Sequence, residues 1–174
     1  MNKARKQRSF SIITLGCKVN QFESENIAHE LKQAGFDRTT KSKKFVDKGV
    51  DTCIINTCTV TQKASMQSRQ AIRQAIRANP GANIIVTGCL AQTDPDNIRQ
   101  IKGVHKIVGH VEKHRIPEMI QSTDLSSITV PTANKSFQPT LSQKSTYSPS
   151  GNRTRPFLKI QDGCDAFCTY CIVP

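Results

Sequence analysis

A short apolar run, Ile84-Ile-Val-Thr-Gly-Cys89, has the form of a buried β-strand that ends at a glycine and a cysteine. Similar runs occur at residues 11–15 and 53–56, and weaker ones at residues 36–39 and 106–108. Strands that are apolar at consecutive positions and alternate with helical segments are typical of a parallel sheet covered on both faces. The pattern therefore predicts an α/β domain with five parallel strands.

Helical periodicity fills the intervals between these runs. We expect helices at residues 20–35, 62–78, 96–101 and 112–120. In the first helix we expect Asn20 as the N-cap, in a capping box with Glu23, and a buried face made of Ile27, Ala28, Leu31 and Ala34. Five strands with flanking helices indicate a flavodoxin-like sheet over residues 10–121.

The composition describes a basic chain in which one folded domain is followed by other segments. Its 174 residues include 25 Lys and Arg against 13 Asp and Glu, a net charge of +12, and seven cysteines. No run approaches the roughly 18 apolar residues of a membrane span, and the basic start lacks a signal-peptide cleavage site. Cytoplasmic cysteines more often bind metals or lie buried than form disulfides. We therefore expect a cytoplasmic protein that does not span membranes.

Changes in composition divide the chain into four segments. Residues 1–9 form a basic tail, and residues 10–121 form the α/β domain. Residues 122–153 are rich in Ser, Thr, Pro and Gln and have few large apolar side chains, so we expect a linker there. An apolar run, Phe157-Leu-Lys-Ile160, then predicts the first strand of a second domain over residues 154–174.

Cys17, Cys58 and Cys89 lie just beyond the carboxyl ends of predicted strands. In an open parallel sheet these ends share one edge, so the topology gathers the three thiols. Three thiolates leave one position open on a tetrahedral metal, or one iron of a 4Fe-4S cluster without a protein ligand. The alternative is three independent buried residues. We assign Cys53 to the core; His110 could be a fourth ligand, although a lone histidine is more often a surface or hydrogen-bonded residue.

A second group, Cys164, Cys168 and Cys171, has the spacing C-x3-C-x2-C, which lets one loop wrap around a cluster. Three such thiolates can hold three irons of a 4Fe-4S cluster and leave the fourth iron free for a substrate. A structural zinc site is the alternative, but it usually needs a fourth Cys or His nearby. The chain has no Gly-rich phosphate loop, so a flavin or nucleotide site is not favoured.

Both cysteine groups make the chain similar to one family, the radical SAM methylthiotransferases. The similarity covers residues 10–121 and 155–174. The stretches that resemble the family are Thr14-Leu-Gly-Cys-Lys-Val-Asn-Gln-Phe-Glu-Ser24, Ile55-Asn-Thr-Cys-Thr-Val60, Thr87-Gly-Cys-Leu-Ala91 and the carboxyl-terminal cysteine group, in which Tyr170 precedes the last cysteine.

The resemblance implies two 4Fe-4S clusters and S-adenosylmethionine as cofactors. Its residue assignments are Cys17, Cys58 and Cys89 for an auxiliary cluster, Cys164, Cys168 and Cys171 for the radical SAM cluster, and Tyr170 for cofactor binding. The cluster loop of that family follows the first strand of a partial (βα) barrel, which would be residues 157–161 here. The family continues well past this loop, so we expect the chain to be part of a longer enzyme or the product of an interrupted reading frame, and to be inactive alone.

The same resemblance implies a reaction on tRNA. One S-adenosylmethionine would methylate sulfur at the auxiliary cluster, and a second would generate the radical that activates adenine carbon 2 beside the anticodon. The stretch around Cys17 is most similar to the branch that acts on N6-threonylcarbamoyladenosine. Implied partners are the tRNA anticodon stem-loop and a reducing protein such as flavodoxin or ferredoxin. The alternatives are the isopentenyladenosine branch and a non-catalytic iron-sulfur or zinc-binding domain.

The positive charge agrees with an RNA substrate, because neutralising phosphates provides much of the affinity for nucleic acid. Arg69, Arg73 and Arg77 recur every four residues along one predicted helix, and three lysines at positions 41, 43 and 44 add to the field. A solvated surface face explains each group equally well.

Overall fold

The computed structural model describes residues 8–39, 46–121, 157, 159–161 and 163–173. In these residues five parallel strands form one sheet in the order β2-β1-β3-β4-β5. The strands are β1 Ser9–Thr14, β2 Asp37–Arg38, β3 Thr52–Thr57, β4 Asn83–Gly88 and β5 Lys106–Val108. This order is that of flavodoxin-like sheets, so the predicted fold class is confirmed.

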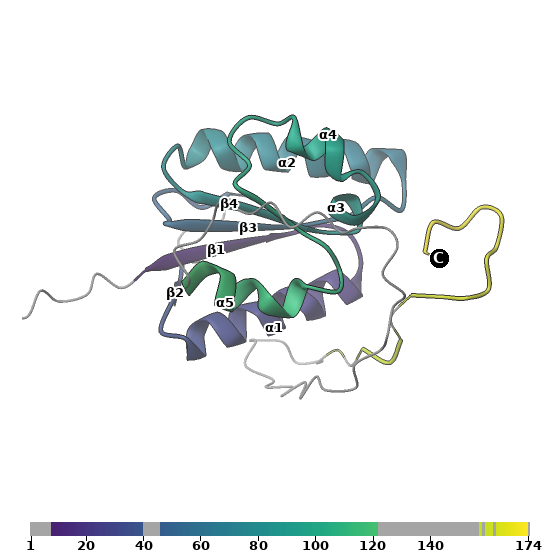
Figure 1. Cartoon of the computed structure of the whole chain (residues 1–174), viewed down its shortest axis with the longest axis horizontal. Helices are drawn as coiled ribbons and strands as arrows, with labels where there is room; N and C mark the ends of the chain where they lie inside the picture. Colours follow the sequence, from purple (N-terminus) through teal and green to yellow (C-terminus); the bar gives the residue numbers. More distant parts are fainter. Residues whose placement is uncertain (1–7, 40–45, 122–156, 158, 162, 174) are drawn as a thin grey trace, which may run out of the picture.

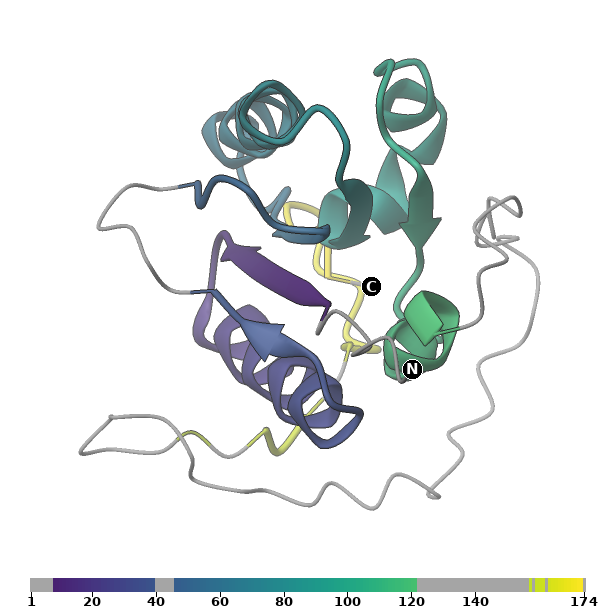
Figure 2. The same ribbon diagram turned by 90° about the vertical axis from the view of Figure 1, so that its left-hand side faces the viewer.

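Helices cover both faces of the sheet (Figures 1 and 2). They are α1 Lys18–Gln33, α2 Gln62–Ala78, α3 Cys89–Thr93, α4 Pro95–Arg99, the 3-10 turn η1 Lys113–Arg115 and α5 Ile116–Gln121. Figure 1 shows α2 and α4 on one face and α1 and α5 on the other. The short α3 was not predicted. No helix in the described part of the chain combines the length and the apolar character needed to cross a bilayer.

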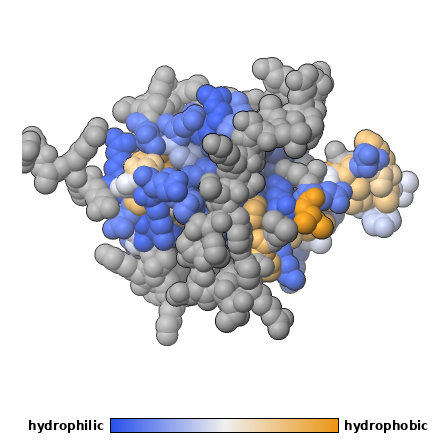
Figure 3. All heavy atoms as spheres, turned by 90° about the horizontal axis from the view of Figure 1, so that it is seen from below, coloured by the Kyte–Doolittle hydropathy of each residue, from blue (hydrophilic) through white to orange (hydrophobic). Residues whose placement is uncertain are grey.

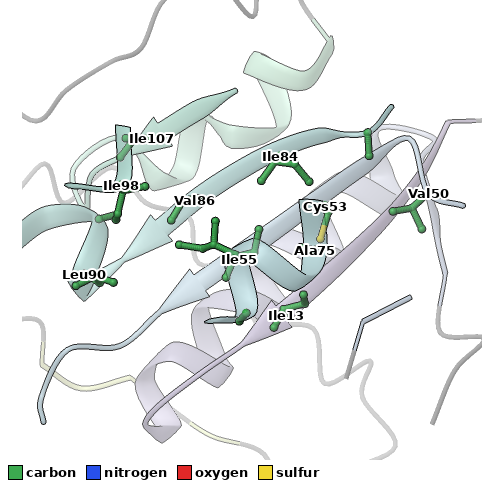
Figure 4. Close-up of a cluster of buried hydrophobic side chains, with 14 residues drawn as sticks. Ile13, Val50, Cys53, Ile55, Ala75, Ile84, Val86, Leu90, Ile98 and Ile107 are labelled. Carbon is green, nitrogen blue, oxygen red and sulfur yellow. The ribbon is translucent and has the colours of Figure 1, made fainter. Parts of the chain in front are cut away.

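Two apolar clusters fill the core, one on each face of the sheet. Strand β3 is buried along its whole length, and alternation sends Cys53 and Ile55 to the α2 side and Ile54 to the α1 side. Figure 4 shows the Cys53 sulfur among Ile13, Val50, Ala75 and other labelled apolar side chains. The assignment of Cys53 to the core is confirmed.

The predicted start of the first helix was wrong. Helix α1 begins at Lys18, and Cys17 is its N-cap without a side-chain capping hydrogen bond. Asn20 lies in the first turn, where its buried amide donates to Leu15 O at 2.7 Å and Thr57 O at 3.0 Å. In this position the Asn20 amide satisfies two buried carbonyl groups, at the ends of β1 and β3, whereas as an N-cap it would satisfy one backbone N–H. At the other end of the helix Ala34 is exposed, because it is the C-cap and the chain has turned away from the sheet.

The strand predicted at residues 157–161 is absent from its described residues, 157 and 159–161, which belong to no helix or strand. A strand needs a neighbour to receive its backbone hydrogen bonds, and no described strand pairs with this segment. Residues 1–7 of the basic tail, the predicted linker 122–153, and the lysines at positions 41, 43 and 44 lie outside the described residues.

Gly88 ends β4 opposite Thr57, the last residue of β3, and has φ +94°. A Cβ atom at Gly88 would lie 2.4 Å from Thr57 O and 2.5 Å from Asn56 Oδ1. Because a backbone carbonyl cannot move aside, only glycine fits this position. The cysteine that follows is thereby held directly against the end of β3.

We predict that Gly88→Ala lowers the free energy of unfolding by about 3 kcal/mol, from the collision and the positive φ together. Gly49→Ala is the matched control, because Gly49 also has a positive φ of +74° but no atom within 4 Å of its Cβ position. That variant should cost only about 1 kcal/mol. Urea denaturation measures both, and equal losses would contradict the close approach at Gly88.

Candidate metal centre

Three cysteines lie at the carboxyl edge of the sheet. Cys17 is the N-cap of α1, Cys58 follows β3 directly, and Cys89 is the first residue of α3 after β4. Because the strands are parallel, the three loops open at the same edge. Their exposure differs: Cys17 is exposed, Cys89 is intermediate and Cys58 is buried.

The loop before Cys17 packs directly on Cys58. A Cβ atom at Gly16 would lie 2.6 Å from both Cβ and Sγ of Cys58, so a larger residue would displace that thiol. Gly16 also has φ +91°, a conformation that lets the chain turn sharply toward Cys17. The two glycines that precede cysteines at the sheet edge, Gly16 and Gly88, thus both bring backbone close to the end of β3.

Ser68 of α2 holds the backbone of Cys58, and a bond from the neighbouring Asn56 ties β3 to α1. Ser68 of α2 is fully buried; its Oγ donates to Cys58 O at 2.8 Å and accepts from Cys58 N at 3.1 Å. Asn56 Nδ2 donates to Asn20 O at 3.0 Å, which ties β3 to α1. These bonds satisfy both backbone groups of Cys58 and leave its sulfur as the group that can take a ligand.

The three thiols influence one another electrostatically. Burial raises the pKa of the Cys89 thiol, the thiolates of Cys58 and Cys17 and the Glu23 carboxylate raise it further, and the Lys113 ammonium lowers it. A thiolate at Cys89 is therefore costly without added positive charge. Thiolates bind iron and zinc, and a bound cation would supply the missing charge. The chemistry of these donors suits a metal cluster, but the three thiols do not lie close enough together in this structure to share one metal ion.

A buried ion-pair group lies beside the thiols. Glu23, in the second turn of α1, accepts from Lys113 Nζ at 2.5 Å and from Lys159 Nζ at 3.0 Å. Burial raises the pKa of this carboxyl, but the two lysines more than offset it, and the net shift is downward. Lys113 Nζ also lies 3.3 Å from Nδ1 of His110, the residue considered as a fourth ligand.

Among the residues that the structure describes, no three Cys, His, Asp or Glu side chains come close enough to share a metal ion.

The second cysteine group lies on the segment 163–173, where Cys171 N donates to Cys168 O at 2.9 Å. Phe167 has φ +49°, so the chain turns back immediately before Cys168. Figure 3 shows an apolar surface on this end of the molecule. Tyr170, assigned to cofactor binding, is 91% exposed.

The arginine series lies on α2. Arg69 pairs with Asp94 at 2.6 Å, and Arg77 Nε donates to Arg73 O at 3.3 Å. Arg69 and Arg73 help to line a surface hollow of about 680 Å³ together with α4 and the residues that follow it. Asp94 neutralises one charge of the series, so only part of it is available to an anionic partner.

Comparison with known proteins gives one family match, to residues 9–109, which cover more than half of the chain. The family is described as uncharacterized protein family UPF0004. The chain belongs to this family. Its match spans the whole parallel sheet and includes all three edge cysteines.

Several curated relatives are methylthiotransferases by name. The chain is 39% identical over 161 residues to the threonylcarbamoyladenosine tRNA methylthiotransferase MtaB of Bacillus subtilis, covering 92% of this chain and 35% of the relative. It is 36% identical to the protein of the same name from Chlamydia pneumoniae, covering 100% and 37%. It is 31% identical to the tRNA-2-methylthio-N(6)-dimethylallyladenosine synthase of Cereibacter sphaeroides, covering 100% and 38%.

These relatives confirm the resemblance to the methylthiotransferases, most strongly to the threonylcarbamoyladenosine branch. The chain spans little more than a third of the length of the curated relatives it matches.

The sequence did not reveal the roles of Ser68, Lys113 and Lys159. Ser68 is the one buried polar residue of α2 on a helix that otherwise buries apolar side chains, a signal that could have been noticed. Lys113 and Lys159 are 90 and 136 residues from Glu23, and no local pattern connects them.

We predict that, among the four cysteines of the α/β domain, iodoacetamide at about pH 8 modifies Cys17 first and Cys53 last in metal-free protein. Cys17 is exposed, whereas burial raises the pKa of the Cys53 thiol to about 11. Lys113→Met should slow modification of Cys89, because it removes the cation that lowers the Cys89 pKa. Peptide mass spectrometry measures each rate, and Lys102→Met is the control for loss of a lysine. Equal rates at Cys17 and Cys53 would contradict the structure.

Proposed function

We propose that this chain is part of a tRNA methylthiotransferase that adds a methylthio group to adenine carbon 2 of N6-threonylcarbamoyladenosine beside the anticodon. The observation that supports the proposal is the placement of three cysteines on loops at one edge of the sheet, in a chain whose relatives are named for this reaction. The relatives named for threonylcarbamoyladenosine reach 39% identity, compared with 31% for the dimethylallyladenosine synthase, which favours the first substrate.

In this proposal Cys17, Cys58 and Cys89 hold an auxiliary 4Fe-4S cluster. Ser68 fixes the backbone of Cys58, and Gly16 leaves room beside its sulfur. Lys113 favours the thiolate of Cys89, which is the form that binds iron. Three protein ligands would leave one iron open, as a site that delivers sulfur requires.

Cys164, Cys168 and Cys171 hold the second cluster, and Tyr170 contributes to binding S-adenosylmethionine. Their spacing lets one loop supply all three ligands, and the exposure of Cys168, Cys171 and Tyr170 leaves them accessible to iron and cofactor. When bound, the two clusters and S-adenosylmethionine would supply the sulfur, the methyl group and the adenosyl radical. The chemistry also needs a reducing partner such as flavodoxin or ferredoxin, and we expect all of it in the cytoplasm with tRNA.

Anaerobic reconstitution tests the two ligand sets. The chain should bind about eight iron atoms, and replacing Cys17, Cys58 and Cys89 by Ala should remove about half of them. Replacing Cys164, Cys168 and Cys171 should remove the other half. Cys53→Ala is the matched control and should keep all the iron, because that thiol lies within the core. Colourless protein that retains zinc would instead support a zinc-binding domain.

Nucleoside analysis of tRNA tests the reaction itself. Cells that lack this protein should lose 2-methylthio-N6-threonylcarbamoyladenosine and retain the N6-threonylcarbamoyladenosine from which it is made. Liquid chromatography with mass spectrometry measures both nucleosides. Loss of the 2-methylthio form of isopentenyladenosine would instead support the other branch, and an unchanged nucleoside profile would contradict the proposal.

A further inference from the structure

Glu23 is a buried carboxylate that binds two lysines from distant parts of the sequence. Its side chain is 10% exposed, and each of its oxygens receives one ammonium group. Lys113 Nζ contacts Oε2, and Lys159 Nζ contacts Oε1. Lys113 belongs to the same domain as Glu23, whereas Lys159 belongs to the segment that leads into the second cysteine group.

One lysine is enough to neutralise one buried carboxylate. Lys113 is itself buried, with 8% of its side chain exposed, so the pair with Glu23 is already complete. Lys159 is only 19% exposed and loses much of its hydration to join the pair. Since the second cation is not needed for neutralisation, its contribution is to fix the segment that carries it.

A second contact holds the same segment on the same helix. Lys18 Nζ lies 5.7 Å from the centre of the Phe157 ring, within the range of a cation–π interaction. Lys18 and Glu23 lie in the first two turns of α1, directly after Cys17. Phe157 and Lys159 are therefore held along the end of α1 that faces the thiol edge.

We propose that Glu23 is the positioning residue that docks the second cysteine group on the edge that carries Cys17, Cys58 and Cys89. Glu23 lies six positions after Cys17, about 9 Å along the helix axis. Cys164 lies five positions after Lys159, at most about 18 Å of chain. One carboxylate thus limits how far the two thiol groups can separate. The significance of this docking for catalysis rests on the proposed function, whereas the docking itself does not.

Acylation of lysine amines in the whole 174-residue chain tests the docking. Glu23→Gln should raise the acylation rate of Lys159 by roughly tenfold, because the ammonium loses its carboxylate partner on α1 and becomes more accessible. Glu25→Gln is the matched control: it removes a carboxylate two positions along α1, and the pair with Arg38, with the same change of charge. It should leave Lys159 unchanged, and the exposed Lys102 gives the reference rate.

A second variant protects the test against misfolding of Glu23→Gln. Lys159→Met leaves the pair of Glu23 and Lys113 intact, so the domain should keep its fold and its unreactive Cys53. Chymotrypsin should then cut after Phe157 roughly tenfold faster, with cleavage after the exposed Phe167 as the internal reference. Lys159→Arg should restore the slow rate.

Unchanged cleavage after Phe157 in Lys159→Met, or unchanged acylation of Lys159 in folded Glu23→Gln, would overturn the proposal. Glu23 would then be only a local partner of Lys113. Neither measurement uses iron, S-adenosylmethionine or tRNA, so a failure here is distinguishable from a failure of the proposed reaction.

Discussion

Hydrogen bonds from buried Thr and Asn side chains cross the carboxyl edge of the sheet; they connect β3 to β4 and β4 to β5, and they tie the ends of β1 and β3 to α1. Thr57 Oγ1 donates to Thr87 O at 2.6 Å, and Thr87 Oγ1 donates to Val108 O at 2.9 Å. Asn56 and Asn20 exchange similar bonds with α1 and the end of β3. Carbonyl groups at the ends of strands need hydrogen-bond donors from outside the sheet. Leaving one buried and unpaired costs about 1–3 kcal/mol. Once they are satisfied in this way, the loops that carry the cysteines have little freedom.

Two groups of ionisable side chains set the electrostatics of this edge: Glu23 with its two lysines, and the three thiols. Glu23 with Lys113 and Lys159 carries one surplus positive charge in a buried place. Burial and the thiolates of Cys58 and Cys17 raise the pKa of Cys89, so the metal-free site resists becoming anionic. Binding a cation removes that resistance, and the surplus charge then lies beside anionic ligands. The same carboxylate that anchors the carboxyl-terminal segment thus helps to set the field around the thiols.

The repeated strand-and-cysteine pattern predicted most of the fold because it is local. Apolar runs of β length fix the strands, and parallel order then fixes which loops meet, without any contact having to be known in advance. The capping prediction at Asn20 failed because a long-range partner, Thr57 O, competes with the local cap. The contact of Glu23 with Lys159 joins residues 136 positions apart, and nothing in either neighbourhood indicates the other. Topology was therefore readable from the sequence, whereas side-chain partnerships between segments were not.

Cys53 and Cys58 show why topology is the better guide to a ligand. Both are buried, with 0% and 1% of their surface exposed, and both belong to β3 or its end. Cys53 is surrounded by apolar side chains of two layers, so its thiol has no anionic role and burial raises its pKa to about 11. Cys58 lies one residue beyond the strand. Position 16 beside its sulfur is a glycine, so no side chain from that position contacts the sulfur, and Cys17 and Cys89 follow the ends of neighbouring strands. Burial alone cannot separate the two residues. Their positions relative to the end of β3 distinguish them, because loops from distant parts of the sequence meet at the carboxyl edge of the sheet and not within the strand.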